Sequence, residues 1–209
     1  MQADLAHVLT WQDVPGYFDF GDVYSEAVAR VTNGAHFVEI GTLLGRSACF
    51  MAAAIRDSGK QITFDAIDAC EHVFNEAGDR IMWLVSADRN ANTSRSLWGA
   101  LLAQGNQYRA ARYCIQCAGF GDSINLIPLS GQESVARYAD FSLDFVFIDA
   151  EHTYKDTVEL LRLYLPKLKT GGVLAGHDYN RRWPGVIQAV AEVLGTVETQ
   201  GDCFIYRKP

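Results

Sequence analysis

Hydrophobic and polar positions alternate along this chain with two different periods. Short runs of apolar and β-branched residues between turn residues predict strands. Longer stretches whose apolar residues recur every three or four positions predict helices, as Ala48, Met51 and Ile55 do within 46–58. The expected strands are 36–40, 61–68, 123–129, 143–149, 171–176 and 203–206, and the expected helices are 46–58, 105–119, 132–139, 154–164 and 185–194.

The order of these elements predicts an α/β fold, with a mostly parallel sheet and helices on both of its faces. The strand at 143–149 is the most apolar, which indicates a central position, since strands buried on both faces lose their polar alternation. We expect the strands at 171–176 and 203–206 to form an antiparallel pair at the edge. Residues 1–33 precede the alternation and look helical from about 21 to 31. They are expected to pack on the sheet or to form a partner interface.

One stretch, residues 70–104, interrupts the alternation. Most connections between a strand and a helix in such folds are only about 2–6 residues long. This insert contains Trp83, Trp98 and a polar run. A lid or substrate-binding element is one interpretation, and a structural excursion or dimer contact is the other. We expect residues 1–209 to form a single domain that includes the insert.

The composition excludes several classes of protein. The chain has 209 residues, 49% of them hydrophobic and 21% charged, which is typical of a globular protein and not of a disordered chain, a collagen or a coiled coil. No apolar run reaches the roughly 18 residues of a membrane span, so no membrane partner is expected. The net charge of −7 argues against nucleic acid as a partner, because phosphate binding needs a basic field. The first residues do not resemble a secretory signal, and a cytoplasmic protein is expected.

Five cysteines, an odd number, also indicate a reduced, intracellular protein. The pair Cys114-x-x-Cys117 raises a redox or zinc hypothesis. It lies inside an expected helix, however, and the chain has no second pair of this spacing. We therefore expect two thiols in or near the core.

The first two strands end in residues suited to a nucleoside ligand. After the strand 36–40, Gly41 and Gly45 allow the backbone to turn tightly and to approach a ligand closely, and the following helix presents its amino end. The G-x-x-x-G spacing is neither the G-x-G-x-x-G of dinucleotide binders nor a P-loop. Asp68 ends the second strand, where an acidic side chain can accept hydrogen bonds from ribose hydroxyls. The two features together predict an adenosine-type ligand.

Polar residues also follow the later strands. Ser130, Gly131 and Gln132 can border an adenine ring or cap a helix. Three carboxylates and two histidines then converge on one sheet edge, namely Asp149, Glu151, His152, His177 and Asp178. Such a group can hold one divalent ion or supply a general base.

Three runs of the chain, VEIGTLLGRSACFMA, FDAID and LDFVFIDAEHTYKDTVELLRLYLPKLKTGGVLAGHDYN, resemble the class I S-adenosylmethionine-dependent methyltransferases. More narrowly, they are similar to the macrocin-type and cephalosporin-hydroxylase-like branch, and to the metal-dependent catechol and caffeoyl-CoA O-methyltransferases. The resemblance covers about residues 34–69 and 105–209. It implies a Rossmann-like fold with a mostly parallel seven-stranded sheet and an antiparallel edge strand.

The resemblance also implies a site. The cofactor-binding residues would be Glu39, Gly41, Thr42, Gly45, Ser47, Asp68, Gly131, Gln132 and Asp149, with Asp68 at the ribose and Gly131 and Gln132 at the adenine. The positions of a divalent metal (Mg²⁺ or Mn²⁺) would be Asp149, His177 and Asp178. The catalytic residues would be Asp149, His152 and His177.

These residues predict methyl transfer from S-adenosylmethionine to an oxygen or nitrogen of a small-molecule acceptor. A hydroxyl acceptor would lose its proton through a metal, or to a histidine with a pKa near neutral. An NAD-type oxidoreductase and a non-catalytic adenosylmethionine-binding subunit are the alternatives.

The acceptor pocket is expected to include residues that follow the fifth strand, together with tryptophans of the insert: Tyr179, Arg181, Arg182, Trp183, Trp83 and Trp98. The two arginines indicate either an anionic substrate group or an exposed solubilising pair. Whether the chain forms a homo-oligomer is left open by the sequence.

Overall fold

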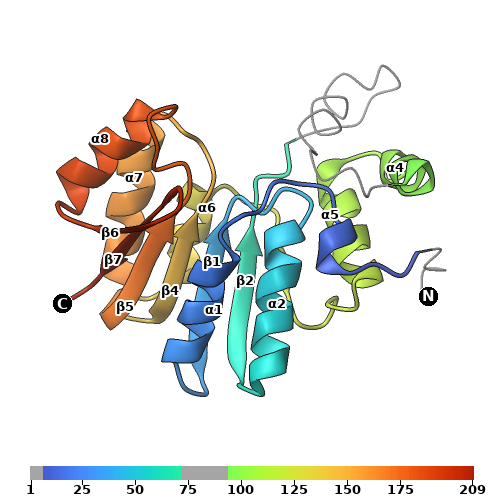
Figure 1. Ribbon diagram of the computed structural model, residues 1–209, viewed down its shortest axis with the longest axis horizontal. Coiled ribbons are helices and arrows are strands. Elements are labelled where there is room, and N and C mark those ends of the chain that lie inside the picture. The colour runs from blue at the N-terminus through green and yellow to red at the C-terminus, as the bar shows by residue number, and fades with distance from the viewer. Residues whose placement is uncertain (1–6, 72–93) are drawn as a thin grey trace.

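The computed structural model describes residues 7–71 and 94–209, with only the backbone of Arg95. Its centre is a seven-stranded sheet with the strand order β3-β2-β1-β4-β5-β7-β6 (Figure 1). The strands are β1 (Ala35–Ile40), β2 (Ile62–Ile67), β3 (Asn125–Ile127), β4 (Leu143–Ile148), β5 (Leu168–Gly176), β6 (Glu198–Gln200) and β7 (Cys203–Arg207). The first five strands pair in parallel, whereas β7 is antiparallel to both β5 and β6. The mostly parallel sheet with an antiparallel edge is therefore confirmed.

Both faces of the sheet are covered by helices. Successive residues of a strand point to opposite sides, so apolar neighbours in a strand place side chains on both faces, which the helices bury. Phe37 and Phe145 are buried in one hydrophobic layer, and their neighbours Val38 and Val146 are buried in the other. The first layer contains α1 (Gly21–Arg30), α2 (Arg46–Ser58), α4 (Arg95–Leu102) and α5 (Gln107–Cys117), and the second contains α7 (Tyr154–Tyr164) and α8 (Pro184–Val193), with the short α6 (Gly131–Ser134) against α7. Three 3₁₀ turns complete the described elements: Trp11–Asp13, Val135–Arg137 and Leu165–Lys167.

Capping residues determine where several helices begin. The side chains of Ser94, Asn106 and Thr153 each accept a hydrogen bond from the backbone N–H three residues later, at 3.0–3.2 Å. These bonds satisfy amide groups that the first turn of a helix leaves without a partner. They place the amino ends of α4, α5 and α7.

The structure differs from the sequence-based expectation at the insert and at the sheet edge. The last part of the insert is the helix α4, whose Leu97 and Leu101 are buried in the first layer. The part of the insert at 72–93, with Trp83, lies outside the described residues. The edge strand β6 was not expected from the pattern, because its sequence Glu-Thr-Gln is short and polar. The expected helix 132–139 is α6 followed by a 3₁₀ turn.

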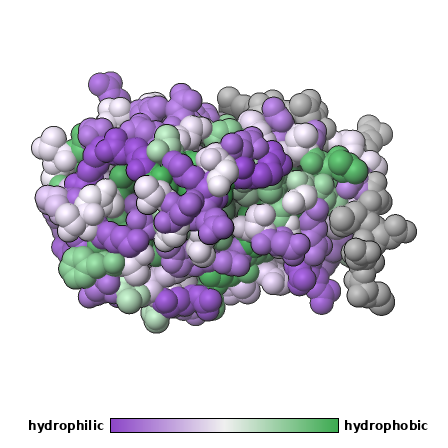
Figure 2. Space-filling view, turned by 90° about the horizontal axis from the view of Figure 1, so that it is seen from below, coloured by the Kyte–Doolittle hydropathy of each residue, from purple (hydrophilic) through white to green (hydrophobic). Residues whose placement is uncertain are grey.

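The amino-terminal segment packs on the sheet, which is one of its two expected roles. Helix α1 covers the first layer through Val23, Tyr24 and Val28. Among the described residues, no helix combines the length and apolar character needed to cross a membrane. Figure 2 shows the molecule from below the view of Figure 1, where hydrophilic residues predominate on the surface and hydrophobic ones are scattered.

Candidate functional site

A cavity of about 1160 Å³ lies at the carboxyl ends of the parallel strands. It is bordered by the loops that follow β1, β2, β3, β4 and β5, and by residues 15–17 of the amino-terminal segment. This edge is where open α/β sheets bind their ligands. The cavity is lined by most residues that the sequence nominated: Gly41, Thr42, Ser47, Asp68, Gly131, Gln132, Asp149, His152, His177 and Asp178. Of the residues nominated for cofactor binding, metal binding or catalysis, Glu39 and Gly45 do not line it.

The loop after β1 depends on its two glycines for different reasons. Gly41 has a φ of +93°, and a Cβ atom on it would lie 1.9 Å from the backbone oxygen of Asp149. Only glycine allows this close approach between the ends of β1 and β4. Gly45 has a φ of +92°, and a Cβ there would lie 2.9 Å from the side chain of Ile115. Gly45 therefore serves the packing of α5 against the loop rather than direct ligand contact.

Asp68 holds this loop in place. Its Oδ2 accepts a hydrogen bond from the backbone N–H of Leu43 at 2.8 Å. Its Oδ1 accepts from the N–H of Cys70 at 2.8 Å and from Nε2 of Gln107 at 2.9 Å. Leu43 and Cys70 both have positive φ angles, which are uncommon outside glycine and cluster at functional sites.

Gln107 lines the cavity but was not nominated from the sequence. It lies on α5, 39 residues after Asp68, and also donates to the backbone oxygen of Leu43 at 3.3 Å. No local pattern marks such a residue, because only the packing of α5 beside the loop brings it to Asp68.

Glu39 lies behind the cavity wall. Its carboxyl group is almost fully buried and accepts hydrogen bonds from the hydroxyls of Ser47 at 2.7 Å and Tyr24 at 2.9 Å. Burial raises the pKa of Glu39 to about 7, although the hydrogen bonds from Ser47 and Tyr24 act in the opposite direction. Glu39 thus supports Ser47, which does line the cavity.

The loop after β3 caps a helix, which is one of its two expected roles, and also lines the cavity. Ser130 caps α6, since its hydroxyl accepts from the N–H of Glu133 at 3.2 Å. Gly131 and Gln132 line the cavity. A Cβ on Gly131 would lie 2.6 Å from Leu160 and 2.8 Å from Ile40, so this position needs a glycine for packing.

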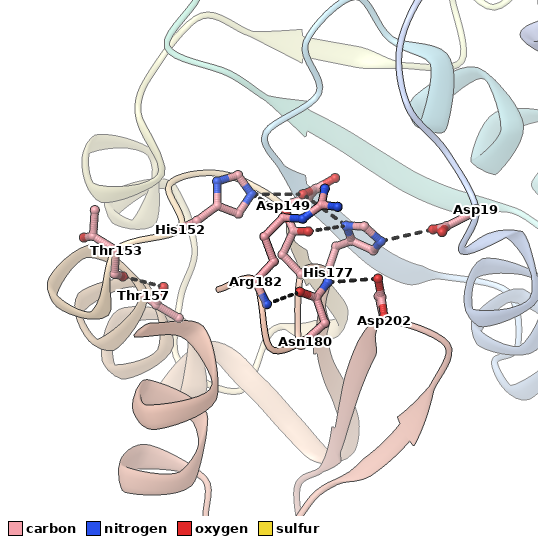
Figure 3. Close-up of polar contacts among 10 residues, drawn as sticks. Asp19, Asp149, His152, Thr153, Thr157, His177, Asn180, Arg182 and Asp202 are labelled. Atoms are coloured by element: carbon pink, nitrogen blue, oxygen red, sulfur yellow. Dashed lines mark hydrogen bonds and ion pairs between the residues drawn. The ribbon is translucent and has the colours of Figure 1, made fainter. Parts of the chain in front are cut away.

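A cluster of carboxylates and imidazoles stands at the ends of β4 and β5 (Figure 3). His152 Nε2 lies 2.5 Å from Asp178 Oδ2 and 3.9 Å from Asp149 Oδ1. One ligand atom from each of Asp149, His152 and Asp178 can be chosen so that all three lie within 4.8 Å of one another. These three residues form the group that could hold a metal ion among the described residues, with His152 in the place that the sequence gave to His177.

His177 points to a different neighbour. Its Nε2 lies 3.0 Å from Asp19 Oδ1, and its Nδ1 lies 3.5 Å from Asp178 Oδ1 and 3.9 Å from Asp149 Oδ1 (Figure 3). The ring is buried, with the ring of Phe20 at a centroid distance of 5.1 Å. His177 therefore joins the cluster to the amino-terminal segment.

That segment adds residues which the sequence did not reveal. Tyr17 lines the cavity, and its hydroxyl donates to Asp19 Oδ2 at 2.7 Å. The guanidinium of Arg46 donates to the backbone oxygens of Val14 and Gly16 at 3.2 and 3.1 Å. These contacts hold the segment over one end of the cavity, and they depend on tertiary structure that residue spacing does not predict.

The cluster shifts the pKa of its members. Hydrogen bonds with Asp149 and Asp178 raise the pKa of His152 to about 9. For His177, burial acts to lower the pKa, but Asp178, Asp149 and Asp19 outweigh it and raise the value to about 9. Burial acts to raise the pKa of Asp178, but the two histidines hold it well below its usual range. The expected histidine pKa near neutral is therefore wrong for both rings.

The other nominated residues divide between the cavity and the core. Arg181, Arg182 and Trp183 line the cavity. Tyr179 does not line it and packs against the second hydrophobic layer, while Trp98 packs against the first.

The thiol pair is part of the core. Cys114 and Cys117 are free thiols on the buried face of α5, as expected for packed cysteines. Burial raises the pKa of both thiols, which makes them poor nucleophiles.

Comparisons with known proteins identify the family and the fold of this chain. A family model described as a methyltransferase domain matches residues 38–179. The structure of the O-methyltransferase NovP is similar, with a TM-score of 0.61 and 18% sequence identity over 90% of this chain and 78% of that one. A putative caffeoyl-CoA O-methyltransferase from Staphylococcus aureus gives 0.59 and 16%, over 94% and 86% of the two chains.

A putative O-methyltransferase from Klebsiella pneumoniae gives a TM-score of 0.56 and 19% identity, over 95% of this chain and 85% of that one. At such identities the likeness shows the fold alone. A search of curated protein sequences found no match.

Proposed function

Because the chain belongs to the methyltransferase-domain family, we propose that it moves the methyl group of S-adenosylmethionine to a hydroxyl oxygen of a small-molecule acceptor. The observation that carries the choice of oxygen is the Asp149–His152–Asp178 cluster in the wall of the cavity. Such a cluster can accept the proton that a hydroxyl loses when it is methylated. An NAD-type oxidoreductase is not favoured by the family match.

The cavity has two sides in this proposal. The cofactor side is lined by Gly41, Thr42, Asp68, Gly131 and Gln132, from the loops after β1, β2 and β3. The acceptor side is lined by Tyr17, His152, His177, Asp178, Arg181, Arg182 and Trp183, from the amino-terminal segment and the loops after β4 and β5. Asp149 stands between the two sides, where the transferred methyl group would pass.

The donors around Asp68 limit how it can bind a ribose. A carboxylate offers about four acceptor positions. Leu43, Cys70 and Gln107 already occupy three of them. One ribose hydroxyl can therefore donate to Asp68 directly, and the second needs another acceptor or a displacement of Gln107.

The chemistry is a single in-line displacement. The acceptor oxygen forms a bond to the methyl carbon while the carbon–sulfur bond breaks, which leaves S-adenosylhomocysteine and a proton. Holding the two reactants in line supplies up to roughly 7–11 kcal/mol of the rate enhancement. We assign the acceptance of the hydroxyl proton to a carboxylate oxygen of Asp149, with the rings of His152 and His177 nearby to stabilise negative charge on the acceptor oxygen.

A divalent cation fits the same cluster. Two carboxylates and one imidazole suit Mn²⁺ and other transition metals better than Mg²⁺, which prefers oxygen ligands only. Asp149, His152 and Asp178 would hold the ion. When bound, it would lower the pKa of the acceptor hydroxyl.

A thermal-shift titration with S-adenosylmethionine, S-adenosylhomocysteine and NADH tests the cofactor. The two sulfur ligands should raise the melting temperature by mass action, and NADH should not. Absence of a shift with either sulfur ligand would refute the proposal.

Transfer of labelled methyl groups to a panel of phenol, catechol and sugar hydroxyls then tests the reaction. Asp149→Asn should abolish transfer, whereas the exposed Asp122→Asn, which does not line the cavity, serves as the control. Cofactor binding without transfer to any acceptor would favour the non-catalytic subunit. A cytoplasmic location is part of the same proposal.

A further inference from the structure

Two neighbouring arginines line the acceptor side of the cavity. Arg181 and Arg182 are both exposed and both border it. In the part of the chain that the structure describes, neither guanidinium group forms a hydrogen bond or an ion pair. Arg46, which also lines the cavity, differs because it is buried and donates to backbone oxygens. Figure 3 shows the side chain of Arg182 extending from its loop toward the Asp149–His177 group.

The backbone that carries the arginines is held on two sides. Asn180 Nδ2 donates to Asp202 Oδ2 at 2.9 Å, and the N–H of Tyr179 donates to the backbone oxygen of Asp202 at 2.8 Å. The N–H of Arg182 donates to Oδ1 of Asn180 at 2.9 Å. On the other side, the ring of Trp183 stacks on His152, a residue of the reaction centre, at a centroid distance of 4.4 Å. A loop fixed in this way presents its side chains at a low entropic cost of binding.

The amino end of α8 adds positive potential at the same place. This ten-residue helix begins directly after Trp183, and no side chain caps it. Pro184 has no N–H, and the N–H groups of Val186 and Ile187 donate to the backbone oxygen of Trp183, so the helix acts here mainly through its dipole. Two of the nearby carboxylates already have partners, since Asp178 contacts His152 and His177, and Asp202 contacts Asn180. The carboxylates of Asp149 and Glu151 also line the cavity.

We propose that Arg181 and Arg182 bind an anionic group of the acceptor, beside the positive end of the α8 dipole. Guanidinium groups pair with carboxylate and phosphate oxygens in a bidentate geometry, so the acceptor would be a hydroxyl compound that carries a carboxylate or a phosphate. The anionic group would anchor the acceptor with its hydroxyl toward Asp149. This inference rests on the proposed O-methyl transfer for the meaning of the acceptor side.

The test uses inorganic phosphate and acetate as probes on the whole protein. Each is titrated at constant ionic strength, with and without saturating S-adenosylhomocysteine, and the melting temperature is followed. We expect a rise of about 2–4 °C with one of the anions at about 20 mM. The larger of the two responses distinguishes a phosphate-bearing from a carboxylate-bearing acceptor.

The double variant Arg181→Gln/Arg182→Gln should lose this response and keep the response to S-adenosylhomocysteine. The matched control is Arg109→Gln/Arg112→Gln, which removes two exposed arginines of α5 that do not line the cavity. No response to either anion, or a response that survives in the first double variant, would overturn the inference. If the unaltered protein gave no response to S-adenosylhomocysteine, that result would instead count against the proposed function. The anion proposal would still be tested by comparing the anion responses of the two double variants.

Discussion

The buried carboxyl group of Glu39 should make the stability of this protein depend on pH in an unusual direction. Its pKa rises from an ordinary value of 4.5 to about 7 in the folded chain, chiefly through burial. Between these two values the unfolded chain binds fewer protons than the folded one. Stability from this group is therefore complete below about pH 4.5 and is lost as the pH rises to about 7.

The size of the effect follows from that interval. Each pH unit corresponds to about 1.4 kcal/mol, so the loss across the interval is about 3 kcal/mol. For a chain of this length it amounts to a change in melting temperature of about 6–12 °C. Substitution Glu39→Gln keeps the shape of the side chain and removes the ionisation. Of the hydroxyls of Ser47 and Tyr24, one can still donate to the amide oxygen, and the other can rotate to accept from the amide N–H.

Urea unfolding of the unaltered protein and of Glu39→Gln at pH 5 and pH 8 measures the contribution. Other titrating groups are shared, so the difference between the two proteins isolates Glu39. We expect the variant to gain about 2.5 kcal/mol relative to the unaltered protein between the two pH values, because a small part of the effect is already lost at pH 5. The exposed Glu159→Gln is the control. A difference that is the same at pH 5 and pH 8 would show that Glu39 is ionised in the folded protein and would refute the reasoning.

Three further predictions follow from the site. Gly41→Ala would place a Cβ against the backbone oxygen of Asp149. We therefore expect urea unfolding to show a loss of about 1–3 kcal/mol in unfolding free energy, and calorimetry to show weaker binding of S-adenosylhomocysteine. Unchanged binding would contradict this prediction. Asp68→Ala removes three hydrogen bonds that order the loop and should raise the KM for S-adenosylmethionine by on the order of 10-fold. Protein freed of metal with EDTA should bind Mn²⁺ more tightly than Mg²⁺ by calorimetry, and Asp178→Asn should abolish that binding; equal affinities would argue against His152 as a ligand.

The fold could be predicted from the sequence where the pattern is local. The strands β1, β2 and β4 are apolar runs that end in polar residues, and each was placed within two residues of its bounds. The strand β6 could not be found this way, because a polar three-residue edge strand has no hydrophobic periodicity. Helix α4 has an apolar pattern and a capping Ser94. It was not predicted, because the whole of residues 70–104 was interpreted as one insert.

The site was predictable as far as residues follow strands directly. Asp68, Asp149 and Asp178 all line the cavity, because parallel strands bring their carboxyl ends to one edge. The sequence did not indicate that His152, rather than His177, would lie in the three-residue cluster with Asp149 and Asp178, since a position in the sequence does not fix which way a ring points. Gln107 and Asp19 were missed because tertiary packing alone brings them to the site.

The two sides of the cavity come from different parts of the chain. Residues of the cofactor side lie in one continuous stretch, from Gly41 to Gln132, whereas the acceptor side combines Tyr17 with residues after position 150. If the two sides have the proposed roles, they can diverge independently: changes around Tyr17 and after position 150 would alter what is methylated and leave the donor site intact. Grafting those end segments from another member of the family would be a direct way to re-engineer acceptor choice on an unchanged cofactor platform.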